Sequence, residues 1–254
     1  MVNAVLIGYG KMGQQTERMI KNEEGIECVG ILDPGGKEEA ADLEELLAAL
    51  TAEGVKTDVI IDFSHPDNLD MILRCAEVSL IPLVIATTGY SEKQTAIIKE
   101  AANSLPVVLS SNLSIGVSLM QRIVKEISDV LGEGFDIEII EKHHNQKIDA
   151  PSGTAKMLAA AMDGGKRFEW KCGREGYGRR AKEIGIHSVR GGSIAGEHTV
   201  IFAGEDEVLE ITHKADSRQI FARGAMLAAK YIINQPPGLY DMKDVLFGRQ
   251  KMPV

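Results

Sequence analysis

The sequence has few cysteines, and their spacing offers no disulfide framework. Cys28, Cys75 and Cys172 are odd in number, lie far apart and form no CxxC pair. This excludes a disulfide-stapled fold and a structural zinc site of the usual spacing, and we predict no metal site. Isolated cysteines of a reducing compartment most often serve as small apolar residues of a core.

Long apolar runs are missing, and positive charge is in deficit. No stretch approaches the ~20 apolar residues of a membrane span, and the start, MVNAVLIGYG, lacks the basic region of a signal peptide. The formal net charge is −9, whereas a nucleic-acid binder should carry a basic face. We therefore expect a cytoplasmic protein without a membrane or nucleic-acid partner, in which an anionic ligand needs a local positive pocket.

The first half of the sequence alternates short apolar runs with amphipathic stretches. Unpatterned apolar runs between helices are typical of parallel strands that helices cover on both faces. The pattern predicts a Rossmann-type, doubly wound α/β domain that binds a dinucleotide. The predicted strands are 3–8, 27–33, 58–63, 81–87 and 106–112, and the predicted helices are 12–22, 41–50, 67–77 and 91–103.

The pattern changes after Asn112, where a second domain begins. A long helix is predicted over 116–131, followed by alternating apolar and polar runs at 135–144, 182–190, 197–204 and 207–215. Gly-containing links between the last three runs indicate hairpins, and hence an α+β domain with a mostly antiparallel sheet. The domains are expected at 1–114 and 115–224, and periodicity does not decide to which of them the final helix belongs.

The segment VLIGYGKMG places glycines between a predicted strand and a predicted helix. In that context Gly8 permits a tight turn, Gly10 lets the backbone approach a pyrophosphate, and Gly13 lets the helix pack on the strand. The helix start offers N–H groups to phosphates. Asp33, twenty residues after Gly13, is placed to bind a ribose 2′-hydroxyl and to repel a 2′-phosphate. Lys37 could pair with such a phosphate, so NADH and NADPH are both candidates.

Two more strand ends carry small polar residues, Ala86-Thr87-Thr88-Gly89 and Ser110-Ser111-Asn112-Leu113. The carboxyl ends of parallel strands meet at one edge of a sheet, where ligands bind. Small residues there would let ribose and nicotinamide approach the backbone. His65, after the third predicted strand, more simply fits a structural or solvated role.

The stretch EKHHNQKIDAPSGTAK, residues 141–156, combines titratable side chains with a helix start. It is interpreted as a strand end, a loop and a helix that Asp149 or Ser152 could cap. Gly153 leaves the helix start bare, so the N–H groups of Gly153 and Thr154 can meet an anion. The hydroxyls of Ser152 and Thr154 add donors, which predicts a carboxylate or phosphate cradle.

Three side chains, those of His143, His144 and Lys147, lie beside this cradle. Histidine titrates near neutrality, so the group suits a small substrate that carries carboxylates and a carbon that gains or loses a proton. A lone histidine would more often be a half-buried strand-end residue, and a lone lysine a solvated one. Their grouping in an acidic chain favours a site.

Nearly the whole sequence resembles the 4-hydroxy-tetrahydrodipicolinate reductase (dihydrodipicolinate reductase) family of bacterial and plant lysine biosynthesis. The most specific segment is the run E-x-H-H-x-x-K-x-D-A-P-S-G-T-A. The resemblance is carried by GYGKMG, VIIDFSHP, ATTGYSE, SSNLSIGV, EKHHNQKIDAPSGTA, RGGSIAGEHTVIFAG and EVLEITHKADSRQIFARGA.

The resemblance implies NAD(P)H-dependent reduction of 4-hydroxy-tetrahydrodipicolinate to tetrahydrodipicolinate in the diaminopimelate and lysine pathway, with hydride delivered to C4 of a cyclic dicarboxylate and loss of water. It implies that His143 donates or accepts a proton and that Lys147 donates a proton and holds the substrate. Substrate carboxylates would be bound by His144, Ser152, Gly153 and Thr154. The cofactor would contact Gly8, Tyr9, Gly10, Lys11, Met12, Gly13, Asp33, Ala86, Thr87, Thr88, Ser110, Ser111, Asn112 and Leu113.

The resemblance also implies a homotetramer that associates through the sheet of the second domain. The final helix would return to the first domain, so that 225–254 complete it. Two departures weaken a preference for NADPH: Lys11 stands where the family more often has arginine, and Asp33 is followed by Pro-Gly-Gly and not by arginine. No role is predicted for residues 163–182.

Two other functions fit parts of the sequence. A different two-domain dehydrogenase could act on a sugar or an aldehyde acid. The aldehyde-oxidising version needs a cysteine nucleophile in the cleft, and the sugar enzyme has no evident use for an anion cradle. A protein that only senses NAD would need the glycine loop, but no proton donors beside the cradle.

Overall fold

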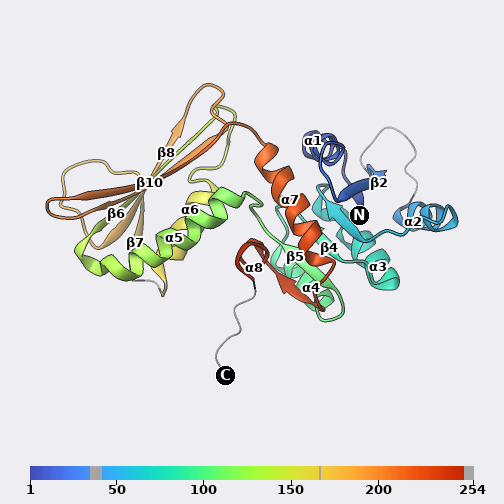
Figure 1. Ribbon diagram of the computed structural model, residues 1–254. Coiled ribbons are helices and arrows are strands. Elements are labelled where there is room, and N and C mark those ends of the chain that lie inside the picture. The colour runs from blue at the N-terminus through green and yellow to red at the C-terminus, as the bar shows by residue number, and fades with distance from the viewer. Residues whose placement is uncertain (35–41, 166, 249–254) are drawn as a thin grey trace. The chain divides into compact units, whose positions relative to one another are not determined.

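The computed structural model describes residues 1–34, 42–165 and 167–248 and shows two compact units, each built on its own sheet (Figure 1). The first unit comprises residues 1–115 together with 219–254, and the second comprises residues 116–218. The chain therefore enters the second unit once, after the fifth strand, and returns to the first at its last long helix.

The first unit is built on a sheet of six parallel strands in the order β11-β5-β4-β3-β1-β2. This confirms the predicted Rossmann-type fold. From β1 to β5 each connection contains a helix that returns the chain to the same end of the sheet, whereas the second unit and a further helix lie between β5 and β11. The strands are β1 (Val2–Ile7), β2 (Ile26–Leu32), β3 (Val59–Asp62), β4 (Leu83–Ile85), β5 (Pro106–Leu109) and β11 (Gly238–Tyr240).

Helices cover this sheet on both faces, which explains why its strands are apolar without alternation. The helices are α1 (Lys11–Ile20), α2 (Leu43–Ala52), α3 (Leu69–Ser79), α4 (Glu92–Ala101), α7 (Gln219–Ile232) and α8 (Met242–Phe247). Helices α2, α3 and α4 share one core with side chains such as Val5 and Ile60. Helices α1, α7 and α8 share the other with Leu6 and Ile61.

Capping residues define the ends of some helices. Ser91 caps α4, because its hydroxyl accepts the N–H of Gln94 while the Gln94 side chain accepts the N–H of Ser91. By contrast, the sequence predicts no element for the stretch after Pro236-Pro237, where β11 and α8 lie. A strand of three residues is too short to show a period.

The second unit is a five-stranded sheet in the order β10-β9-β6-β8-β7, with two helices on one face. The core between them includes Val124 of α5, Leu158 of α6 and Phe202 of β9. The opposite face of the sheet is not covered by these helices. The elements are α5 (Ile115–Leu131), β6 (Asp136–His143), α6 (Gly153–Asp163), β7 (Glu169–Cys172), β8 (Glu183–Arg190), β9 (Gly196–Ala203) and β10 (Val208–Ala215).

The pairing in this sheet corrects the prediction of a mostly antiparallel sheet. Strand β9 pairs antiparallel with β10 and β6, whereas β8 pairs parallel with β6 and β7. The glycine-rich link after β8 crosses the end of β6 and is not a tight hairpin. Its Gly191 N–H donates to the His143 carbonyl oxygen at 2.9 Å, and its Gly192 carbonyl accepts the Asn145 N–H at 3.2 Å. Strand β7, which has no apolar pattern, was not predicted.

The cysteines correct a second expectation. Cys75 is buried, but Cys28 is only partly buried and Cys172 is exposed on β7. Core packing therefore explains Cys75 and, in part, Cys28, which packs against the core shared by α1, α7 and α8, but not Cys172.

Candidate active site

Strand β6 delivers two side chains of the motif to the face of its sheet that carries the helices. Strand alternation places Glu141 and His143 on that face and Lys142 on the other. The Glu141 side chain is 0% exposed and that of His143 is 11% exposed. Lys142 instead pairs with Glu197, its Nζ lying 3.1 Å from Oε2.

The predicted cap of α6 is confirmed. The Ser152 hydroxyl accepts the Ala155 N–H at 3.1 Å. The Ala150–Pro151 peptide bond before it is cis. Gly153 is exposed, and a Cβ built there would meet no atom within 4 Å, so the surface at the helix start is open to a ligand. The backbone N–H of Ser152 is already used, because it donates to Glu141 Oε1 at 3.1 Å.

Arg190, at the end of β8, closes a bidentate ion pair with Glu141. Its Nη1 lies 2.8 Å from Oε2 and its Nη2 lies 2.7 Å from Oε1. Nη2 also donates to the Asp149 carbonyl oxygen at 2.6 Å. Burial alone would raise the pKa of Glu141, but the hydrogen bonds, above all those from Arg190, lower that pKa to about 2. Glu141 is therefore a buried carboxylate, ionised at neutral pH.

His143 lies between this carboxylate and β9. Its Nδ1 is 2.6 Å from Glu141 Oε2, and its Nε2 would lie 3.2 Å from a Cβ built on Gly196. The absence of a side chain at Gly196 therefore leaves room for the Nε2 edge of the ring. Burial lowers the pKa of His143, with a contribution from the charge of Lys147, and Glu141 opposes it. The imidazole is therefore mainly neutral at neutral pH.

A third histidine lies beneath the motif. His198 of β9 is 4% exposed. Its ring is 5.1 Å from that of His143 in an edge-on arrangement. Its Nε2 lies 3.0 Å from the Ser152 hydroxyl oxygen. Burial lowers the pKa of His198 to about 4, so this ring is neutral as well.

Lys147 and His144 belong to the loop between β6 and α6. Lys147 Nζ lies 2.6 Å from Asp149 Oδ1, and its side chain is 22% exposed. Its backbone N–H donates to the His144 carbonyl oxygen at 3.1 Å, and His144 is itself partly buried. The second unit thus holds two groups that can carry a proton, His143 and Lys147, in the segment that leads to an open helix start.

The glycine loop of the first unit has the geometry that its spacing predicts. Gly8 has φ +87°, and a Cβ on it would lie 2.6 Å from the Phe63 carbonyl oxygen. A Cβ on Gly13 would lie 2.0 Å from the Gly8 carbonyl oxygen, whereas Gly10 faces open space. Asp33 Oδ1 accepts the Tyr9 N–H at 3.1 Å, so the acid and the glycine loop are in contact.

The two other predicted strand ends lie at the carboxyl edge of the same sheet. Residues 86–88 follow β4, where Thr87 is buried and Thr88 is exposed. Residues 110–113 follow β5. There a Cβ on Gly224 of α7 would lie 1.7 Å from the Leu113 carbonyl oxygen, so α7 packs directly on this segment. His65 is 70% exposed and accepts the Asp67 N–H at 3.3 Å, which fits the expected structural role.

Asp62, at the end of β3, was not predicted as a site residue. It is 1% exposed. Its carboxylate accepts hydrogen bonds from the Ser64 N–H at 2.9 Å, the Ser64 hydroxyl at 2.6 Å and the Tyr90 hydroxyl at 3.1 Å. Burial raises the pKa of Asp62. The residue ties the loops after β3 and β4 together.

Comparison with known proteins identifies the family. The family model described as "Dihydrodipicolinate reductase, N-terminus" matches residues 2–113, and "Dihydrodipicolinate reductase, C-terminus" matches residues 116–246. The chain belongs to the dihydrodipicolinate reductase family. The resemblance inferred from the motifs is thereby confirmed.

Curated reductases of this family align over almost the full chain. The 4-hydroxy-tetrahydrodipicolinate reductase of Clostridium novyi (strain NT) is 44% identical over 250 residues, which are 97% of this chain and 98% of that protein. The enzyme of the same name from Brachyspira hyodysenteriae is also 44% identical and covers 96% of this chain and 100% of its own.

A solved structure of the family has the same fold. Dipicolinate-bound dihydrodipicolinate reductase from Paenisporosarcina sp. TG-14 superposes with a TM-score of 0.77 at 26% identity, over 97% of this chain and 100% of that one. A probable dehydrogenase from Thermotoga maritima has a TM-score of 0.63 at 11% identity over 96% and 92% of the two chains. The second likeness concerns the fold alone.

Three residues of the second unit's site, Glu141, Arg190 and His198, were not predicted from the sequence. Glu141 stands in the specific motif without an assigned role, and Arg190 and His198 begin and end the segment RGGSIAGEH. Lys37, considered as a phosphate partner, lies outside the described residues. Within the described ranges, no group of three or more His, Cys, Asp or Glu side chains is placed to hold a metal ion.

Proposed function

We propose that this chain reduces 4-hydroxy-tetrahydrodipicolinate to tetrahydrodipicolinate with NADH or NADPH, in diaminopimelate and lysine biosynthesis. Membership of the reductase family supports this reaction. The observation that carries it is the open start of α6, at Gly153, in the same segment as His143 and Lys147. A helix start suits a carboxylate, and the dipicolinate-bound relative is named for a planar ring with two of them.

Each part of the cradle has a role in this proposal. The backbone N–H groups of Gly153 and Thr154 bind one substrate carboxylate, with the Thr154 hydroxyl as a further donor. His144 and Lys147 bind the substrate from the loop. Ser152 shapes the cradle as the cap of α6, and its hydroxyl is a donor candidate.

The chemistry requires one hydride and one proton. The bound dinucleotide supplies a hydride to C4, and the C4 hydroxyl leaves as water once it is protonated. His143 and Lys147 are the proposed proton donors, and a neutral His143 can in turn accept a proton from solvent or from Lys147. The balanced products are tetrahydrodipicolinate, water and the oxidised dinucleotide.

The dinucleotide is proposed to bind the first unit along the carboxyl edge of its sheet. Gly10 faces the open space that a pyrophosphate needs. Asp33 would accept the ribose 2′-hydroxyl with the oxygen that does not hold Tyr9, which favours NADH. The remaining proposed contacts are Gly8, Tyr9, Lys11, Met12, Gly13, Ala86, Thr87, Thr88, Ser110, Ser111, Asn112 and Leu113.

A homotetramer that associates through the second sheet, in the cytoplasm, completes the proposal. Support comes from the face of this sheet opposite α5 and α6. Val189 and Val208 on that face are 44% and 61% exposed, and association through this face would remove their apolar surface from water. Within the described ranges, no helix combines the length and apolar character that crossing a bilayer requires.

A kinetic assay tests the function. The purified chain should oxidise NADH or NADPH only when the cyclic substrate is present. Replacing either His143 or Lys147 with alanine should lower kcat by about 100-fold or more, the usual contribution of general acid catalysis. Lys125→Ala, which removes an exposed lysine of α5 paired with Asp129, should keep wild-type kinetics. Full activity in both site variants would refute the proposed roles.

A further inference from the structure

We infer that Glu141, held by Arg190, is the positioning residue of His143. Glu141 fixes which ring nitrogen of His143 exchanges the proton. The same carboxylate also anchors the start of the anion-binding helix α6. The inference rests on the proposed function, because it assigns a task to a residue that acts only through the proposed proton-transfer group.

The Glu141 carboxylate accepts four hydrogen bonds from three residues. Oε2 accepts from His143 Nδ1 at 2.6 Å and from Arg190 Nη1 at 2.8 Å. Oε1 accepts from Arg190 Nη2 at 2.7 Å and from the Ser152 N–H at 3.1 Å. A carboxylate offers about four lone-pair sites, so the group is fully used. A 0% exposed glutamate without this set would be strongly destabilising.

This arrangement decides the tautomer of His143. An ionised carboxylate can only accept hydrogen bonds, so the hydrogen in the contact with Oε2 belongs to Nδ1. The neutral ring then carries its lone pair on Nε2, at the edge that faces Gly196. The hydrogen bond made by one ring nitrogen of a histidine decides whether the other nitrogen carries a proton. Nε2 is therefore the atom of His143 that exchanges the proton.

Arg190 also balances the negative charge of Glu141 beside His143. A lone buried carboxylate would stabilise imidazolium and hold a proton on His143. The guanidinium cancels that charge without contacting the imidazole in any described hydrogen bond. The charged and titratable groups that face His143 are Glu141, Arg190, Lys147 and His198. Together with burial they leave the pKa of His143 below its ordinary value, so the ring can return to the neutral form after each proton transfer.

The same carboxylate also connects the proton-transfer residue to the cradle. Glu141 holds the N–H of Ser152, the cap of α6, while Arg190 holds the Asp149 carbonyl oxygen at 2.6 Å in the loop that carries Lys147. A disturbance at Glu141 should therefore reach the ring orientation and the helix start together. This predicts a loss in kcat as well as a weaker affinity for a dicarboxylate.

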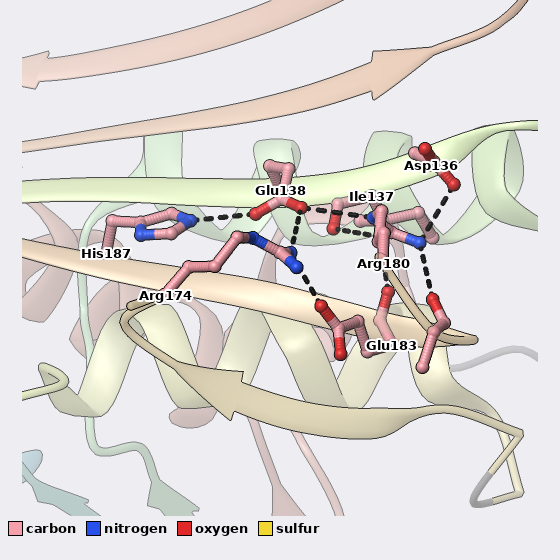
Figure 2. Close-up of polar contacts among 8 residues, drawn as sticks. Asp136, Ile137, Glu138, Arg174, Arg180, Glu183 and His187 are labelled. Atoms are coloured by element: carbon pink, nitrogen blue, oxygen red, sulfur yellow. Dashed lines mark hydrogen bonds and ion pairs between the residues drawn. The ribbon is translucent and has the colours of Figure 1, made fainter. Parts of the chain in front are cut away.

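Strand β6 supplies a matched control in Glu138, whose polar contacts are drawn in Figure 2. Glu138 faces the opposite side of the sheet. It bonds to His187 Nε2 at 2.8 Å, Arg174 Nη2 at 3.0 Å and Arg180 Nε at 3.2 Å. Glu138 and Glu141 lie on the same strand, and each has a histidine and an arginine as partners. Replacing it with glutamine removes the same charge without touching the candidate site.

The test uses the full-length protein with nitrogen-15 histidine labelling, steady-state kinetics and titration with pyridine-2,6-dicarboxylate. Ring nitrogen shifts should show wild-type His143, assigned by its loss in His143→Ala, as the Nδ1–H tautomer. In Glu141→Gln that signal should change to the other tautomer or a mixture, and kcat should fall by at least about 100-fold. In Glu138→Gln the spectrum and kinetics should stay at wild-type values, with the assembly checked by light scattering.

Three outcomes separate this inference from the proposed function. An Nε2–H tautomer in the wild-type protein would overturn the inference, whether or not Glu141→Gln folds. Wild-type kcat in Glu141→Gln alongside an inactive His143→Ala would overturn it while the proposed function stands. A wild-type protein with no reductase activity would instead overturn the proposed function, and the tautomer measurement would still decide the positioning role.

Discussion

The Ser152 hydroxyl oxygen lies 3.0 Å from Nε2 of His198, and it also accepts the Ala155 N–H at the start of α6. One buried histidine thus supports the cap of the helix that is proposed to bind the substrate. His198 comes 46 residues after Ser152 in the sequence. The contact exists because the link before β9 crosses the end of β6 and brings the two strands side by side.

His198 should make the protein sensitive to acid. Its pKa falls from 6.5 to about 4 on folding, so the unfolded chain binds this proton at a higher pH than the folded chain does. Stability should be complete above about pH 6.5 and decline as pH falls toward about 4, by up to about 3 kcal/mol. We expect His198→Gln to remove most of this decline. Urea unfolding of both proteins near pH 7 and near pH 4.5 measures it, and equal losses in the two proteins would contradict the assignment.

Gly13→Ala should destabilise the first unit. The added Cβ would lie 2.0 Å from the Gly8 carbonyl oxygen, a backbone atom that cannot rotate away. Either the loop or α1 must move, at a cost of about 1–3 kcal/mol or more. The free energy of unfolding measures the effect, and an unchanged value would show that the loop is looser than this packing indicates.

Gly10→Ala provides the contrasting variant in the same loop. A Cβ at this position meets no atom within 4 Å, and φ is −69°, so stability should stay close to wild type. If the pyrophosphate approaches here, the methyl group should weaken NADH binding by about tenfold, or roughly 1.4 kcal/mol. Fluorescence titration with NADH gives the affinity, and wild-type affinity would exclude Gly10 from the binding surface.

The first unit could be predicted from the sequence far better than the site in the second. Its strands β1 to β5 appear as short apolar runs between helices, and its glycines sit at a spacing that one mechanism explains, whereas β11 is too short to show a pattern. Glu141 and Arg190 are 49 residues apart, and nothing local marks them as a pair. They come into contact because β6 pairs parallel with β8. This pairing was not predicted, because the glycine-rich link after β8 was interpreted as a hairpin. β7 has only exposed residues, so it carries no periodic signal.

Asp33→Asn should shift the cofactor preference toward NADPH. In the wild type the Tyr9 N–H lies 3.1 Å from Asp33 Oδ1, and the amide oxygen of asparagine can still accept this hydrogen bond. The substitution removes the negative charge that repels a 2′-phosphate. The ratio of kcat/KM for NADPH to that for NADH should rise by about tenfold, roughly 1.4 kcal/mol. Glu27→Gln, an exposed acid on the same strand β2, should leave the ratio unchanged. A ratio that moves equally in both variants would point to a general charge effect.

Ile140→Lys should break the proposed tetramer. Ile140 lies on the central strand β6, on the face of the sheet opposite the helices, next to Thr199 of β9 and His187 of β8. Burying an unpaired ammonium between copies costs several kcal/mol. Light scattering should give a mass of four chains for the wild type and a lower mass for the variant. Val130→Lys on α5, where the valine is 83% exposed, should keep the wild-type mass.

The most direct test of the substrate site is a crystal structure of the protein with NADH and pyridine-2,6-dicarboxylate. We expect one carboxylate of the ring within hydrogen-bonding distance of the Gly153 and Thr154 N–H groups, with His143 Nε2 and Lys147 Nζ beside the ring. A ring bound elsewhere, while the start of α6 stays empty or covered, would contradict the cradle on which the proposed chemistry depends.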